Sequence, residues 1–142
     1  MNSEGRRLRP GSALANIKIL LVDDDSTILT IVSTLLTMLN HEVSVTTATS
    51  ALDALSILRV DNVGFDLVVT DHHMPGMHGL QLLERVREEF RIPVIVISAD
   101  ERKMLIRESL ERGAASFINK PVKPEDLQDI WRFAKPTRNA RL

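Results

Sequence analysis

The chain has 142 residues, of which 44% are hydrophobic and 26% are charged, and its formal net charge is −1 at pH 7. This composition is that of one ordinary globular domain, and the near-zero charge gives no general attraction to nucleic acid or an anionic membrane, so we expect no direct nucleic-acid binding. The absence of cysteine excludes disulfides and thiolate metal sites, and no apolar run approaches the roughly 18 residues that span a bilayer.

The two ends of the chain lack an apolar period. Residues 1–15 carry Arg6, Arg7 and Arg9 with Pro10 and Gly11, and we expect a disordered basic leader there. Residues 136–142 are expected to form a disordered tail. The domain itself is therefore placed at residues 16–135.

The first strand and helix follow the leader. Residues 17–22 form a nearly continuous aliphatic run, typical of a strand covered on both faces. Asp23, Asp24 and Asp25 follow it, and Asp25 or Ser26 is suited to cap the next helix. That helix carries an apolar stripe that we expect to face the sheet, formed by Ile28, Ile31, Val32, Leu35, Leu36 and Leu39.

The second strand is expected at residues 42–46, where polar and apolar side chains alternate, so that one face is wetter and the strand lies at a sheet edge. Ser50 and Asp53 have the spacing of a capping box for a second helix, which residues 61–64 should break. The buried stripe of this helix is predicted to be Ala51, Ala54, Leu55 and Leu58.

The third and fourth strands, residues 67–70 and 93–98, are apolar and fully covered. A turn at residues 74–76 leads from the third strand to a helix, and residues 101–112 predict a fourth helix that is basic on its surface and stopped by Gly113. The third helix is expected to bury Leu80, Leu83, Val86 and Phe90.

A short fifth strand at residues 116–119 and a last helix opened by Pro124 complete the pattern. This helix is expected to turn four apolar side chains inward: Leu127, Ile130, Trp131 and Ala134. Five strands alternating with five helices predict an α/β fold with a doubly wound, five-stranded parallel sheet in the order 2-1-3-4-5. Sites in such sheets lie at the carboxyl ends of the strands, where this sequence places Asp23, Asp24, Asp71, Ser98 and Lys120.

These strand ends also carry a family resemblance. Five separated motifs resemble, in order and spacing, the receiver domain of two-component response regulators, a CheY-like member of the flavodoxin-like folds. The motifs are residues 21–24, Thr70-Asp71 with Met74-Pro75 and Gly79, Ser98-Ala99, Gly113-Ala114, and Lys120-Pro121. The resemblance runs from about residue 17 to residue 134, and residues 126–131 look most like receivers of plant type-B response regulators in cytokinin phosphorelays.

The resemblance implies a role for each site residue. Asp71 would accept a phosphoryl group from a phosphohistidine on a histidine phosphotransfer protein or histidine kinase, and Lys120 would contact that group. Asp24, Asp71 and the backbone carbonyl of His73 would bind Mg²⁺, and Asp23 would hold the ion through water. The chain would catalyse only its own phosphorylation and dephosphorylation, could form a receiver homodimer, and would reside in the cytoplasm or nucleus.

The resemblance also implies a switch. Ser98 would move toward the phosphoryl group, Phe117 would fill the space that it leaves, and Pro121 would follow a cis peptide bond. Moving such a switch from 1:99 to 99:1 requires about 5.5 kcal/mol, which is a large demand on a few polar contacts. We therefore expect phosphorylation to bias the conformation only in part.

The chemistry of the acids supports the metal. Two carboxylates about 4 Å apart repel by about 4 kcal/mol at an effective dielectric near 20, so Asp23, Asp24 and Asp71 need cations. Mg²⁺ prefers oxygen ligands, and Lys120 adds a fixed positive charge. Asp25 is interpreted as a helix cap or a solvated acid.

Three histidines depart from the simple pattern. We hypothesise that His73, two residues past Asp71, and Asp100, two past Ser98, together set the lifetime of the phosphoryl group. His78 stands where the family usually has aspartate, and the sequence shows no reason for it. A zinc site formed by His72, His73 and His78 is disfavoured because their spacing fits no compact motif.

Two other functions compete with the leading one. A phosphorylation-independent pseudo-receiver would be a pure interaction module, but it would be favoured by loss of Asp71 or Lys120, and both are present. A phosphatase of the haloacid dehalogenase type would form an aspartyl-phosphate in turnover. That class needs a second aspartate two residues after the first, and His73 occupies that position.

Overall fold

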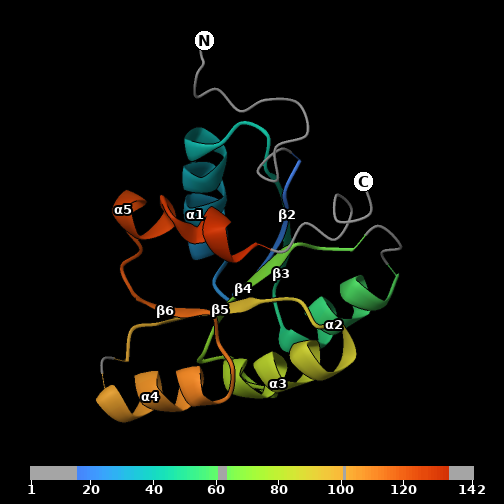
Figure 1. Cartoon of the computed structure of the whole chain (residues 1–142), viewed down its shortest axis with the longest axis vertical. Coiled ribbons are helices and arrows are strands. Elements are labelled where there is room, and N and C mark those ends of the chain that lie inside the picture. Colours follow the sequence, from blue (N-terminus) through green and yellow to red (C-terminus); the bar gives the residue numbers. More distant parts are fainter. Residues whose placement is uncertain (1–15, 61–63, 101, 135–142) are drawn as a thin grey trace.

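The computed structural model describes residues 16–60, 64–100 and 102–134 (Figure 1). The expected leader and tail lie outside these residues, as do Glu101 and residues 61–63 of the expected break after the second helix. The boundaries of the domain therefore remain predictions.

One parallel sheet contains every predicted strand. The strands are β2 (Lys18–Val22), β3 (Ser44–Ala48), β4 (Leu67–Asp71), β5 (Val94–Ser98) and β6 (Ser116–Asn119). Their order is β3-β2-β4-β5-β6, which is the predicted 2-1-3-4-5 and confirms the doubly wound, flavodoxin-like fold. Every residue of β4 and β5 is buried, whereas the edge strands β3 and β6 are only partly buried.

Helices cover both faces of this sheet (Figure 1). On one face lie α1 (Ser26–Leu39), α5 (Pro124–Leu127) and the 3₁₀ helix η1 (Ile130–Phe133), and on the other lie α2 (Ala51–Val60), α3 (Gly79–Glu89) and α4 (Lys103–Glu111). Strand side chains alternate between the faces, so that Leu20 packs toward α2 and α3, and Leu21 packs toward α1. Among the described residues, no helix is both long and apolar enough to cross a membrane.

The stripe predicted for α1 is partly wrong. Leu29, Val32 and Leu36 are buried, whereas Ile31 is 48% exposed and Leu39 is also exposed. The sequence of α1, STILTIVSTLLTML, contains no charged residue. Periodicity alone could not choose between two overlapping apolar stripes, because only serine and threonine mark the polar side. In α2, where charged and apolar residues alternate more clearly, the four predicted positions are all buried.

The last predicted helix is also shorter than expected. It is a single α-turn from Pro124 to Leu127, after which Asp129 leaves helical geometry and η1 begins. Aspartate competes for hydrogen bonds with the backbone and favours turns over helix interiors, which accounts for the break. Leu127 and Ile130 are buried as predicted, but Trp131 and Ala134 are only half-buried.

The turn after β4 positions the predicted acceptor. Gly79 donates its backbone N–H to the carbonyl of His72 at 2.8 Å, which folds the start of α3 back against the end of β4. A Cβ at Gly79 would lie 2.5 Å from the Asp71 carbonyl oxygen and 2.7 Å from the His72 Cα, so only glycine fits. His78 caps α3: its Nδ1 accepts from the Gln81 N–H, and the Gln81 side chain accepts from the His78 N–H. This capping box supplies the reason for His78 that the sequence did not show.

Replacing Gly79 with alanine should destabilise the domain by about 2–3 kcal/mol, because the added methyl meets backbone atoms that cannot move aside. Helix propensity alone predicts the opposite sign, since alanine is about 1 kcal/mol better than glycine in a helix. Urea unfolding followed by fluorescence of Trp131, the only tryptophan, measures the difference. The matched control is Gly76→Asn, at a φ of +78° with open space around it, where we expect about 1 kcal/mol or less. Equal stability of the Gly79→Ala variant and the parent would contradict this account.

Candidate functional site

The predicted site residues meet at the carboxyl edge of the sheet. Asp23 follows β2, Asp71 ends β4, Ser98 ends β5 and Lys120 follows β6. The strand register aligns these ends, because Val22 pairs with Thr70, Asp71 with Ile97, and Ser98 with Asn119. Side chains that are far apart in the sequence are thereby brought into one site.

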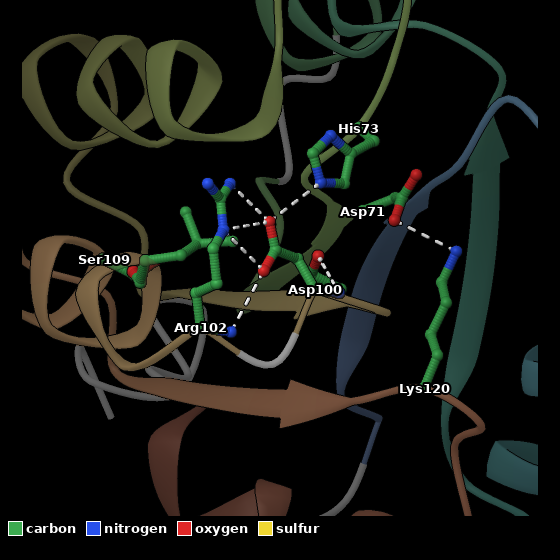
Figure 2. A network of polar contacts seen from close by, with 8 residues as sticks. Asp71, His73, Asp100, Arg102, Ser109 and Lys120 are labelled. Atoms are coloured by element: carbon green, nitrogen blue, oxygen red, sulfur yellow. Dashed lines mark hydrogen bonds and ion pairs between the residues drawn. The ribbon is translucent and has the colours of Figure 1, made fainter.

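Lys120 joins two buried carboxylates. Its Nζ lies 3.0 Å from Asp23 Oδ2 and 3.0 Å from Asp71 Oδ1, and Figure 2 shows the Lys120 and Asp71 side chains pointing at each other. Asp23 is only 2% exposed and Asp71 only 5%. The Asp25 backbone N–H donates to the other Asp23 oxygen at 2.9 Å and fixes its orientation. The cation is therefore shared by two acids that have little access to water.

Asp24 completes an acidic cluster. One carboxylate oxygen from each of Asp23, Asp24 and Asp71 lies within 4.8 Å of the others, and Asp24 itself is exposed. Three carboxylates beside one ammonium leave excess negative charge, and their hard oxygen atoms are the ligands that Mg²⁺ prefers. The donor set therefore fits the predicted metal, and its open side at Asp24 leaves room for the waters that Mg²⁺ retains.

The surroundings affect the charged forms of Asp71 and Lys120 differently. Burial raises the pKa of Asp71, the Asp23 and Asp24 charges raise it further, and the hydrogen bond from Lys120 only partly offsets this. Burial alone would lower the pKa of Lys120, but its hydrogen bonds to Asp71 and Asp23 raise it, so the ammonium keeps its charge. The site thus holds a fixed cation next to an acid whose ionised form is disfavoured.

The two predicted switch residues lie near the site. Ser98 is fully buried, and its Oγ accepts the Asp100 backbone N–H at 3.0 Å. Phe117 is half-buried in β6 and packs against the core on the α3–α4 side. The peptide bond between Lys120 and Pro121 is cis, as the resemblance implied. Movement of Ser98 and Phe117 on phosphorylation remains a prediction.

His73 and Asp100 lie close to each other, and their joint influence on phosphoryl lifetime stays a prediction. His73 Nε2 is 3.7 Å from Asp100 Oδ2, and Arg102, which the sequence did not single out for this site, binds the same carboxylate at 2.6 Å (Figure 2). Arg102 also lowers the pKa of Asp100 to about 2. The spacing of two residues between Asp100 and Arg102 was the available signal, because aspartate accepts backbone and side-chain bonds from residues just after it.

The rings of the three histidines lie next to one another. The His72 ring contacts the rings of His73 and His78, with centroids 4.6 and 5.2 Å away. Over residues 16–60, 64–100 and 102–134, however, the three aspartates are the only group of three or more potential ligand side chains that gather closely enough. The disfavoured zinc site therefore finds no support in this geometry.

Comparison with known sequences gives consistent results. The family model described as "Response regulator receiver domain" matches residues 19–132. The two-component response regulator ARR2 of Arabidopsis thaliana is 42% identical over 118 residues, which cover 83% of this chain and 18% of that protein. The two-component response regulator ORR21 of Oryza sativa subsp. indica is 40% identical over 116 residues, which cover 82% of this chain and 16% of that protein. The chain spans less than a fifth of either relative.

Comparison with solved structures agrees. The crystal structure of a response regulator receiver domain protein from Clostridium thermocellum superposes with a TM-score of 0.77 at 28% identity, covering 89% of this chain and 99% of that one. The family resemblance inferred from the five motifs is thus confirmed, and so is its likeness to plant response regulators.

Substituting Asp71 with asparagine should stabilise the metal-free domain near neutral pH. Because burial raises the Asp71 pKa in the folded state, the ionised carboxylate opposes folding above that pKa, and stability recovers as the pH falls toward the unfolded-state pKa. Asparagine removes this cost, while Lys120 keeps Asp23 as a partner. Denaturant unfolding of the parent and the variant at pH 5 and pH 8 measures the difference in unfolding free energy. The variant should be stabilised more at pH 8 than at pH 5.

Mg²⁺ should reduce the difference in unfolding free energy between Asp71→Asn and the parent, because it should bind and stabilise the parent more strongly. A ligand present at 100 times its dissociation constant stabilises a folded protein by about 2.7 kcal/mol. The control is Asp25→Asn, since asparagine can still cap α1 and Asp25 is exposed. A lower stability of Asp71→Asn at pH 8 without metal would contradict the account of the site.

Proposed function

Because the chain belongs to the response regulator receiver family, we propose that Asp71 accepts a phosphoryl group from a phosphohistidine, with Mg²⁺ bound beside it, and that this changes a partner-binding surface. The observation that carries the proposal is the single ammonium of Lys120 within 3.0 Å of both Asp23 and Asp71, next to the exposed Asp24. This arrangement combines an acceptor oxygen, a fixed cation and a set of hard ligands in one place.

The chemistry follows from these groups. A carboxylate oxygen of Asp71 forms a bond to phosphorus as the phosphorus–nitrogen bond of the donor breaks and leaves its electron pair on the imidazole. Such transfers require little of the protein beyond positioning and neutralisation of charge. Lys120 opposes the added negative charge, and Asp23, Asp24, Asp71 and the His73 carbonyl would hold Mg²⁺. When bound, Mg²⁺ supplies further positive charge to the phosphoryl oxygens.

Ser98 would link phosphorylation of Asp71 to a change at the surface that binds a partner. The new dianion can accept a charge-assisted hydrogen bond from the Ser98 hydroxyl, which already accepts the Asp100 N–H and can donate at the same time. Because Ser98 and Phe117 are on neighbouring strands β5 and β6, a shift of one opens space for the other. The surface formed by α4, β6 and α5 is where this change would be sensed.

The setting is proposed from the relatives. The chain resembles one segment of longer two-component response regulators, so we place it in a phosphorelay in which a histidine phosphotransfer protein or histidine kinase is the donor. Cytokinin signalling in the cytoplasm or nucleus is the pathway that the plant likeness favours. A receiver homodimer is a further possible output.

Incubation with Mg²⁺ and acetyl phosphate should add one phosphoryl group, about 80 Da, to the intact mass, with the acid-stable and base-labile behaviour of an acyl phosphate. The Asp71→Asn variant and an EDTA-treated sample should show no adduct. Asp24→Asn should slow the reaction strongly because it removes one of the metal ligands, whereas the neighbouring Asp25→Asn should react like the parent. Absence of an adduct, together with no spectral response to beryllofluoride, would favour the pseudo-receiver interaction module.

The His73→Asn variant should lose its phosphoryl group about three to ten times faster than the parent, a change of about 0.65–1.4 kcal/mol in activation free energy. His73 follows Asp71 by two residues and its imidazole reaches to 3.7 Å from Asp100 (Figure 2), so we expect a shorter side chain to open the approach of water. Decay of the intact-mass adduct after donor removal gives the rate. Since the His73 side chain is 59% exposed, unfolding stability should not change. An unchanged rate would remove the hypothesis that His73 influences phosphoryl lifetime.

A further inference from the structure

Arg102 makes an unusually complete set of contacts with Asp100. Its Nε lies 2.9 Å from both carboxylate oxygens, its Nη2 donates to Oδ2 at 2.6 Å, and its backbone N–H donates to Oδ1 at 3.0 Å. Figure 2 shows the guanidinium turned back toward Asp100 from the start of α4. Arg102 is the N-cap of α4, but a guanidinium has only donors and cannot cap the helix N–H groups. Its donors are directed to Asp100.

We propose that Arg102 is a positioning residue that lengthens the lifetime of phosphorylated Asp71 by holding the Asp100 carboxylate and keeping its oxygens from the hydrolytic water. The proposal rests on the proposed function, because it concerns the loss of the phosphoryl group that Asp71 accepts. It adds a residue outside the set of acids, Ser98 and Lys120 that forms the site.

The position of Asp100 supports this role. Asp100 lies two residues beyond the end of β5, and β5 is the neighbour of β4, which ends at Asp71. The Asp100 N–H binds Ser98, and its carboxylate faces His73 at 3.7 Å. The Asp100 side chain is 16% exposed, so water can still reach its carboxylate. Without a partner it would be a hydrogen-bond acceptor for that water.

The hydrolysis that Arg102 restrains is simple. The oxygen of water forms a bond to phosphorus, and the bond between phosphorus and the Asp71 oxygen breaks with its electron pair left on the Asp71 carboxylate. Both hydrogens of the water end on the released dihydrogen phosphate, so that atoms and charge balance. A free carboxylate beside the water would orient it and accept its proton transiently, which is the ordinary contribution of a general base.

The contacts of Arg102 oppose that contribution. Four donor contacts from one residue occupy both oxygens of Asp100, and the guanidinium offsets its charge. A carboxylate whose two oxygens both accept hydrogen bonds from a guanidinium is a poor proton acceptor for water. Arg102 itself is 75% exposed, so the pair is of little use for folding stability and its geometry calls for another explanation.

The test compares decay of the phosphorylated protein in four variants. Arg102→Gln should shorten the phosphoryl lifetime about three- to tenfold, because it frees the Asp100 carboxylate. Asp100→Asn alone should not shorten it, and adding Arg102→Gln to Asp100→Asn should have no further effect. Lys103→Gln, the neighbouring residue with the same change of charge, should decay like the parent.

A second measurement separates this role from general damage to the site. Beryllofluoride occupies the phosphoryl position without being hydrolysed, so its affinity should be the same for the parent and Arg102→Gln. Arg102→Lys should give an intermediate lifetime, since lysine supplies the charge without the two-pronged geometry.

The outcomes are distinct. Failure of the parent to form any adduct would overturn the proposed function, and this inference with it. An adduct that decays equally in the parent and Arg102→Gln would overturn the inference alone. The inference would also be overturned if Arg102→Gln accelerated decay as much in the Asp100→Asn background as in the parent. It would be overturned, too, if Arg102→Gln weakened beryllofluoride binding by the same factor by which it shortened the phosphoryl lifetime.

Discussion

The structure depends on one cation held between two buried carboxylates. Lys120 neutralises Asp23 and Asp71 only in part, because two acids share one ammonium and Asp24 adds a third negative charge nearby. Burying charge without full compensation costs stability, and the sheet must supply the difference through its apolar core. The site therefore concentrates negative charge at the carboxyl edge of the sheet.

Several features of the fold hold Asp71 and Asp23 in place despite their charge. Every residue of β4 and β5 is buried, and β4, which carries Asp71, lies between β2 and β5. Gly79 then lets α3 return so close to Asp71 that no side chain could intervene, and the Asp25 N–H orients Asp23. Both contacts are made by backbone atoms, which are less mobile than side chains.

The sequence predicted the features that depend on strong local patterns. The spacing of the residues allowed one interpretation for the strands, the α2 stripe and the five motifs. The structure agrees with these predictions. The exposed Ile31 was missed because α1 has no charges to mark its outer side, and the break at Asp129 was missed because apolar spacing continues across it. The capping contact of His78 became visible only when the backbone was placed, whereas the contact of Arg102 with Asp100 had a signal in their two-residue spacing that the sequence analysis did not use.

The shortness of α5 and η1 affects how easily this segment opens. A helix of one turn has no stability of its own, since isolated helices need roughly 12–15 residues to be even marginal in water. The segment of α5 and η1 is therefore retained mainly by Leu127 and Ile130, two buried side chains on the α1 side of the sheet. Elements with so few anchors open locally at a small fraction of the free energy needed to unfold the whole domain. A partner could therefore reshape this segment without disturbing β4, the strand that carries Asp71.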